Sequence, residues 1–171
     1  AIAPLYPSFN AMLLRYGSPQ IRNAATIGGN IANGSPIGDG PPALIALGAT
    51  LILRQGDKRR RMPLEDFFIA YQKQDRLRGE FVEAIELLKD QNRLRCYKLS
   101  KRFDQDISAV CGCINISVEG NIIKTVRIAF GGMAATPSRA NKTEEILVGE
   151  VWEIKTFENA KATLLQDVSP M

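Results

Sequence analysis

Residues 26–42 carry five glycines and fit neither a helix nor a strand by pattern. Their apolar residues follow neither a 3.6-residue nor a two-residue period, and polar residues separate the glycines. Adjacent glycines, here Gly28 and Gly29, can adopt positive φ angles and direct successive backbone amides toward one point. The sequence therefore predicts a long structured loop with the geometry of an anion-binding nest.

The polar side chains of this loop suit a phosphate that is joined to a polyol. Asn30, Asn33 and Ser35 supply donors, whereas Asp39 is acceptor-only when ionised and can accept from sugar-like hydroxyls or backbone amides. The segment 26–30, Thr-Ile-Gly-Gly-Asn, matches neither GxGxxG nor GxxxxGK[ST]. From the residues alone, an anion-binding loop and a purely structural loop remain alternatives.

The composition limits the chemistry that side chains of this chain can perform. Its 171 residues include no histidine, which removes Ser-His-Asp and Cys-His pairs, HExxH zinc sites and every imidazole acid or base. Three cysteines without a CxxC motif favour a reducing cytoplasm over a disulfide framework. We therefore predict no catalytic side chain and no metal ligand, with the chemistry supplied by a bound cofactor or from outside the chain.

Charge and hydropathy argue against two classes of partner. The net charge of +4 is too small to demand a polyanion, and the basic run 58–61 is interpreted as a solvated hairpin arm. The longest nearly apolar stretch, 43–53, falls short of the ~20 residues that cross a bilayer. We predict neither nucleic acid nor a membrane as partner. A basic nucleic-acid module, using Arg59–Arg61 with Arg22 and Lys101, and a purely structural interaction domain remain the alternative functions.

Short helices and strands are predicted along the rest of the chain, which indicates an α+β fold. Periodicity and turn signals predict helices over 8–16, 43–47, 64–71, 138–148 and 156–166, and strands over 50–54, 58–62, 81–88, 95–100, 107–119 and 122–130. By pattern alone, Tyr16 belongs to the apolar face of its helix and Lys98 is an ordinary strand lysine. Four consecutive polar residues, 89–92, place a domain boundary between residues 1–89 and 93–171.

Three segments of the chain resemble a known family. They are residues 17–39 (GSPQIRNAATIGGNIANGSPIGD), 97–107 (YKLSKRFDQDI) and 127–133 (RIAFGGM). They are similar to the flavoprotein part of molybdenum hydroxylases of the xanthine dehydrogenase type. The resemblance implies the second subdomain of a PCMH-type FAD-binding domain over 1–89. It also implies a small antiparallel sheet with helices, like the CO dehydrogenase flavoprotein C-terminal domain, over 93–171.

The same resemblance implies which residues contact FAD. Thr26, Ile27, Gly28, Gly29 and Asn30 would cradle the pyrophosphate, and Asp39 would also contact the cofactor. Tyr16 stands where the family has an aromatic residue near the flavin ring, and Val82 and Lys98 resemble later flavin-side contacts.

The implied role is electron relay. FAD would take electrons from 2Fe-2S centres and pass them to NAD, while a molybdopterin site elsewhere hydroxylates a purine. The Fe-S and molybdenum-cofactor domains, and the family's first FAD subdomain, have no counterpart in these 171 residues. We therefore expect a fragment or one product of a split protein, which lacks turnover by itself and whose loop 26–39 is exposed or disordered.

Overall fold

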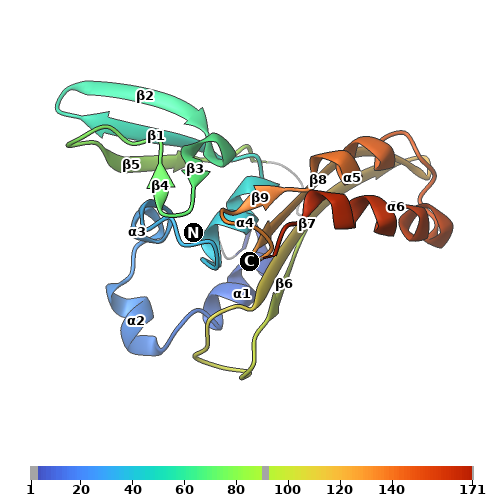
Figure 1. Cartoon of the computed structure of the whole chain (residues 1–171), viewed down its shortest axis with the longest axis horizontal. Coiled ribbons are helices and arrows are strands. Elements are labelled where there is room, and N and C mark those ends of the chain that lie inside the picture. The colour runs from blue at the N-terminus through green and yellow to red at the C-terminus, as the bar shows by residue number, and fades with distance from the viewer. Residues whose placement is uncertain (1–3, 90–92, 171) are drawn as a thin grey trace.

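The computed structural model describes residues 4–89 and 93–170 (Figure 1). The first half contains helices α1 (Pro7–Leu14), α2 (Pro19–Ala24), α3 (Ile27–Ala32) and α4 (Gly40–Ala46), strands β1 (Thr50–Gln55) and β2 (Lys58–Pro63), the 3₁₀ turn η1 (Leu64–Phe67), and strands β3 (Phe68–Ala70), β4 (Lys73–Gln74) and β5 (Phe81–Glu86). The second half contains strands β6 (Leu94–Leu99), β7 (Val110–Glu119), β8 (Ile122–Gly131) and β9 (Ser138–Arg139), followed by helices α5 (Asn141–Leu147) and α6 (Ile154–Asp167).

The strands of the described residues form small antiparallel sheets, which confirms the α+β prediction. One sheet has the order β2-β1-β5, a second pairs β3 with β4, and a third has the order β6-β7-β8-β9. The β7–β8 hairpin turns at Gly120 and Asn121, which both have positive φ angles of 54° and 67°. That geometry is typical of a two-residue hairpin turn.

Helix α4 is the central element of the fold, because all seven of its residues are buried. Its sequence GPPALIA is apolar on every side, as expected of a helix that is enclosed by other elements. It contacts η1 from the first half and β7 and β8 from the second. One hydrophobic cluster consequently includes Leu51 and Phe67 together with Leu94 and Cys113.

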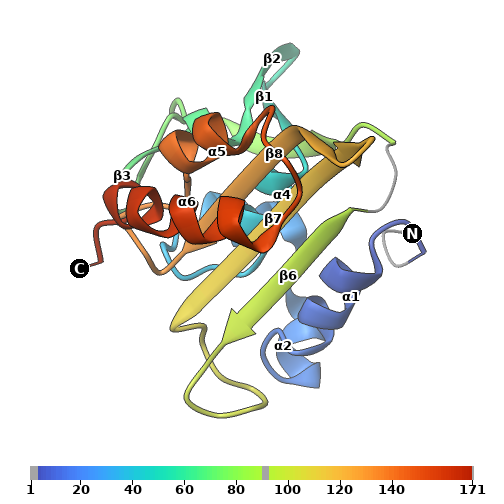
Figure 2. The same cartoon turned by 90° about the vertical axis from the view of Figure 1, so that its right-hand side faces the viewer.

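Helices cover both faces of the four-stranded sheet. In Figure 2, α5 and α6 lie on the near side of β7 and β8, and α4 lies behind them. A second hydrophobic cluster, which includes Ile123, Ile128, Leu147 and Ala160, packs α5 and α6 onto the sheet. The alternation of Ile128 and Ala129 between the two clusters follows the two-residue period of a strand.

The largest difference from the sequence prediction lies in residues 26–42. They contain helix α3 and the start of α4, where a continuous loop without helical structure was expected. The expectation of exposure is also wrong for the second part of the segment, since Ile31, Gly34 and Asp39 are buried. Burial of Ile31 against the core gives the glycine-rich helix a tertiary anchor that its local propensity lacks.

Smaller differences concern helices and strand ends. Helix α2 was not predicted, and residues 138–139 form strand β9 where the start of a helix was expected. The segment 64–71 holds only a 3₁₀ turn before β3 begins. Within residues 4–89 and 93–170, no helix combines the length and the apolar character that crossing a bilayer requires.

Candidate functional site

The first turn of helix α3 presents backbone amides beside a cavity. Thr26 has an extended conformation, and its Oγ1 accepts a hydrogen bond of 2.9 Å from the Gly29 amide. This is an ordinary N-cap, and it orients the helix start. The amides of Ile27 and Gly28 lie ahead of the first intrahelical hydrogen bond, so helix geometry directs them out of the N-terminus.

The two glycines keep this turn free of side chains, although not by the conformation that was predicted. Both glycines lie within α3, and neither has a positive φ angle. Within residues 26–42, the nearest residue that does is Gly34, with a φ of 63°. A Cβ on Gly28 would lie 3.5 Å from Cγ1 of Val82, which is an ordinary contact distance. A Cβ on Gly29 would lie 2.9 Å from Oγ1 of Thr26. The prediction of a positive-φ nest is therefore wrong, and a helix N-terminus takes its place.

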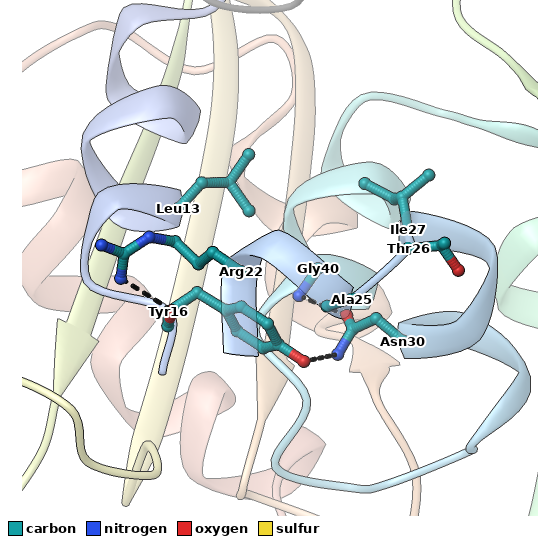
Figure 3. Close-up of a pocket in the computed structure, with 8 residues that line it drawn as sticks. All are labelled: Leu13, Tyr16, Arg22, Ala25, Thr26, Ile27, Asn30 and Gly40. Atoms are coloured by element: carbon teal, nitrogen blue, oxygen red, sulfur yellow. Dashed lines mark hydrogen bonds between the residues drawn. The ribbon is translucent and has the colours of Figure 1, made fainter. Parts of the chain in front are cut away.

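A cavity of about 230 Å³ opens between α1, α2 and this turn (Figure 3). Its lining residues are Leu13, Tyr16, Arg22, Ala25, Thr26, Ile27, Asn30 and Gly40. The Tyr16 ring points from just beyond the end of α1 toward Asn30, and the Arg22 guanidinium lies beside the Tyr16 main chain. Arg22 donates to the backbone carbonyls of Tyr16 at 3.1 Å and of Gly17 at 2.8 Å. The structure thus places Tyr16 and the Thr26 turn on one cavity, which sequence reasoning from helix periodicity did not predict.

A second groove, of about 510 Å³, borders the same turn on the side of strand β5. Thr26, Ile27 and Gly28 form one wall, and residues 82–85 with Leu87 and Leu44 form the rest. Val82 therefore lies directly across from Gly28, although the two residues are more than fifty positions apart in the sequence. The turn therefore borders two hollows, and Thr26 and Ile27 line both of them.

The remaining loop donors have local partners or lie elsewhere. Asn30 Oδ1 accepts from the Gly40 amide at 3.0 Å, and Asn30 Nδ2 donates to the Tyr16 hydroxyl at 3.4 Å. Ser35 Oγ accepts from the Ile37 amide at 3.4 Å, while Asn33 is exposed at the end of α3. Neither Asn33 nor Ser35 lines the two hollows described above.

Asp39 and Lys98 contact each other. Lys98 Nζ lies 2.6 Å from Asp39 Oδ2, and the Ser108 hydroxyl donates to the other carboxylate oxygen. The two side chains of the ion pair are 4% and 2% exposed, respectively. Helix periodicity and strand pattern gave no signal of this pairing, because the residues are 59 positions apart.

The arginines of strand β2 are also paired. Arg59 Nε lies 2.6 Å from Glu83, Arg60 Nε lies 2.7 Å from Glu80, and Arg61 pairs with Glu86. Hydrogen bonding to Arg59 is the main reason that the pKa of Glu83 falls to about 2. Acidic side chains therefore offset much of the positive charge of this run.

The three cysteines lie close together as free thiols. Cys111 and Cys113 are buried with their Sγ atoms 4.0 Å apart, and Cys96 is half-buried opposite Cys113. The hydrogen bond between the Cys111 and Cys113 thiols is the main reason that the pKa of Cys113 is raised. Among the residues that the structure describes, no three His, Cys, Asp or Glu side chains are grouped so that they could hold a metal ion.

Comparison with known protein families connects this geometry to a cofactor. Residues 1–87 match the FAD-binding domain in molybdopterin dehydrogenase, and residues 95–171 match the CO dehydrogenase flavoprotein C-terminal domain. The chain belongs to the molybdenum hydroxylase family, as its FAD-binding portion. The resemblance inferred from residues 17–39, 97–107 and 127–133 is confirmed.

The individual relatives of this FAD-binding portion are longer proteins than the chain itself. A xanthine dehydrogenase of Oryza sativa subsp. japonica is 35% identical over 90% of the chain and 12% of the relative. A nicotinate hydroxylase of Emericella nidulans is 38% identical over 83% of the chain and 11% of the relative. A glyceraldehyde dehydrogenase medium chain of Sulfolobus acidocaldarius is 34% identical over 78% of the chain and 48% of the relative. The chain thus spans about an eighth of the length of the first two.

Solved structures agree with this assignment. A carbon monoxide dehydrogenase from Hydrogenophaga pseudoflava superposes with a TM-score of 0.91 at 25% identity, over 99% of this chain and 60% of that one. A Cu,Mo-CO dehydrogenase superposes with a TM-score of 0.89 at 26% identity over the same shares. The family's cofactor in this domain is FAD.

The residues present fit such a cofactor on the evidence of this structure. The first turn of α3 carries outward amides and glycines where side chains would obstruct approach, and hollows lie on both of its sides. Thr26 and Ile27 line both hollows, so one extended ligand can cross the turn. An anionic diphosphate suits the chemistry of this turn, because the backbone amides at a helix N-terminus favour negative charge.

Proposed function

We propose that this chain forms the second half of the FAD site of a xanthine dehydrogenase-like molybdenum hydroxylase that acts in the cytoplasm. Bound FAD would supply the redox chemistry, taking electrons from 2Fe-2S centres and giving hydride to NAD. The molybdopterin site that hydroxylates a purine, and the Fe-S centres, would lie in other domains or subunits. The chain's own residues bind and orient the cofactor, and none of them acts as a catalytic acid or base.

The observation that carries this proposal is the first turn of helix α3, where Gly28 and Gly29 have no side chains and a hollow lies on each side. The chain that contains it belongs to the FAD-binding family. We assign the pyrophosphate to the amides of Ile27 and Gly28, because a helix N-terminus favours an anion. Tyr16 and Val82 then lie on opposite sides of the turn, where each would contact an aromatic end of the cofactor. Direct contacts from Asn33 and Ser35 have less support, since both lie outside the two hollows.

A nucleic-acid module is the less favoured alternative. Arg59, Arg60 and Arg61 pair with acidic side chains of the same sheet region, and Arg22 is held by backbone carbonyls. A phosphate backbone would have to displace these partners, which reduces the electrostatic gain of binding.

A fluorescence titration with FAD tests the proposal. We expect micromolar or weaker binding by the 171-residue chain. We expect much tighter binding when the chain is joined to the family's first FAD subdomain. Each tenfold in affinity corresponds to only ~1.4 kcal/mol. Loss of a few charged hydrogen bonds, at ~1.5–3 kcal/mol each, is therefore enough to account for the difference.

Two outcomes would contradict the proposal. Equal submicromolar binding by both proteins would show that the chain does not form only half of the site. Absence of a flavin absorption band from the longest native protein that contains this chain would remove the cofactor assignment. Binding of an oligonucleotide that weakens steeply with salt would instead support the nucleic-acid alternative.

A further inference from the structure

The three cysteines gather on the inner face of strands β6 and β7, and none of them belongs to the residues assigned to FAD. We propose that Cys96 and Cys113 form a peroxide-reactive site, in which a hydroperoxide oxidises Cys96 and the Cys113 thiol then closes a disulfide between the two strands. Cys111, on the same face, stays a thiol. This proposal is independent of FAD binding by residues 26–30.

The strand pairing places Cys96 and Cys113 directly opposite each other. The Cys96 amide points away from β7, because it donates to Ser8 Oγ of helix α1 at 2.8 Å. In an antiparallel ladder the amide and the carbonyl of one residue face the same neighbour, so this is a non-hydrogen-bonded pair with Cα atoms about 4.5 Å apart. Disulfides span Cα separations of roughly 4.4–6.8 Å. The two strands can therefore accept the bridge without a change of register.

The alternative partner, Cys111, is less well placed for a bridge. Its Sγ lies 4.0 Å from that of Cys113. The two residues are two positions apart on one strand, however, and a rise of about 3.4 Å per residue puts their Cα atoms at the upper end of the disulfide range. Cys111 Sγ is also within 3.4 Å of Met12 Sδ in the core. We therefore assign Cys111 to packing.

The surroundings of Cys96 and Cys113 give them different roles. Cys96 is half-buried whereas Cys113 is fully buried, so an oxidant from solvent meets Cys96 first. A hydrogen bond with the Cys113 thiol is the main reason that the pKa of Cys96 is lowered, and Ser8 lowers it further. The pKa of Cys113 is raised, mainly by its hydrogen bond with Cys111. An accessible thiolate beside a second, protonated thiol is the arrangement of a reactive cysteine with its resolving partner.

The chemistry takes two steps. The Cys96 thiolate attacks the terminal oxygen of the hydroperoxide, the O–O bond breaks, and the released alkoxide or hydroxide takes a proton from water. The Cys113 sulfur then attacks the sulfur of the Cys96 sulfenic acid, and the hydroxyl group leaves with the Cys113 proton as water. The two thiols lose two electrons, which reduce the hydroperoxide to an alcohol or water. A dithiol reverses the bridge by exchange.

Hydrogen peroxide, applied to the folded and fully reduced 171-residue chain, is the probe. Remaining thiols are blocked with N-ethylmaleimide, and the chain is digested without reductant. Trypsin releases Cys96 in the peptide 96–98 and both β7 cysteines in the peptide 103–124. We expect these peptides to be joined by a disulfide that dithiothreitol cleaves. Fragmentation of the joined peptides should place the bond at Cys113 and the maleimide at Cys111.

Two variants from the same cluster form a matched pair. Cys111→Ala should keep the bridge, whereas Cys113→Ala should yield at least tenfold less of the joined peptides. In Cys113→Ala the oxidised Cys96 should persist as a sulfenic acid, which dimedone labels. Thermal unfolding shows whether each variant is folded. If Cys113→Ala does not fold, the fragmentation pattern of the unsubstituted chain decides the pairing.

Three results would overturn the proposal. The first is a bridge in the folded chain between Cys96 and Cys111, or between Cys111 and Cys113. The second is oxidation of Cys96 to sulfinic or sulfonic acid without any bridge, which would show that Cys113 does not resolve the sulfenic acid. The third is equal yields of the joined peptides from Cys111→Ala and Cys113→Ala.

Discussion

At the scale of single residues, the site depends on small groups whose local conformations differ from those that pattern analysis predicts. Gly28 and Gly29 are glycines in a helical turn, and Thr26 caps that turn with its hydroxyl. Their importance lies in the absence of side chains near the outward amides. A substitution can therefore alter ligand approach without straining the backbone, because every L-residue can adopt helical φ angles.

Gly28→Ala separates these two effects. We expect FAD binding to weaken at least tenfold, because the methyl group stands beside the amides that receive the pyrophosphate. The melting temperature should stay the same or rise by a few degrees, since alanine in a helix is favoured over glycine by roughly 0.5–1 kcal/mol. FAD titration and thermal unfolding measure the two results.

Asn33→Ala, at the other end of the same helix, is the control for this prediction, and it should leave the affinity unchanged. Unaltered FAD affinity in Gly28→Ala would contradict the assignment of the turn. A β-branched residue at Gly29 gives a second test, because it would crowd the Thr26 hydroxyl and should abolish FAD retention.

At the scale of elements, the three-stranded sheet carries a set of ion pairs across its strands. Glu83 on β5 accepts from Arg59 on β2 and from Arg54 on β1, at 2.6 and 3.0 Å. Glu80 precedes β5 and pairs with Arg60, which also lowers its pKa. These ion pairs connect the edge strands β2 and β5 across the central strand β1. They add to the backbone hydrogen bonds that hold the sheet together.

The stability of the chain should therefore decline in acid. The pKa of Glu83 is about 2 in the folded chain, against about 4.3 for an unperturbed glutamate. As the pH falls, Glu83 is therefore protonated in the unfolded chain before it is protonated in the folded chain. The stabilisation that ionised Glu83 provides is present above about pH 5 and is lost as the pH falls toward 2. Urea unfolding at pH 6, 4 and 2.5 measures this decline, and Glu83→Gln should reduce its steepness. An equal decline in the variant would show that other carboxylates account for it.

At the scale of the whole molecule, the two halves share one core. Helix α4 comes from the first half, yet it is enclosed partly by β7 and β8 of the second. The domain boundary that the sequence predicts at residues 89–92 stays a prediction, and the packing of the hydrophobic cluster crosses it. We therefore infer that neither half folds independently of the other.

Leu44→Ala tests this inference with the chain's single tryptophan, Trp152, which lies in the second half. Leu44 is 1% exposed in α4, and a buried Leu→Ala change costs about 2–5 kcal/mol. If unfolding is cooperative, the Trp152 fluorescence midpoint should fall together with the far-UV circular dichroism midpoint. A Trp152 transition that stays at the original denaturant concentration would show that the halves unfold separately.

Local sequence determined much of this protein. The β7–β8 hairpin was predictable because Gly120 and Asn121 tolerate the positive φ angles of a tight turn, and β1 and β2 because their turn residues are equally local. The FAD-binding family was also recognisable from the resemblance of residues 17–39, 97–107 and 127–133 to known members. These features depend on neighbours in the chain, so pattern analysis can detect them.

Tertiary structure alone decided the rest. A glycine-rich segment has little helical propensity, and it forms α3 because Ile31 reaches the core and Thr26 caps the start. The pairing of Asp39 with Lys98 joins positions 59 residues apart, and no periodicity encodes a contact of that separation. Both outcomes result from burial, which forces polar groups to find partners and stabilises helices that would not form alone.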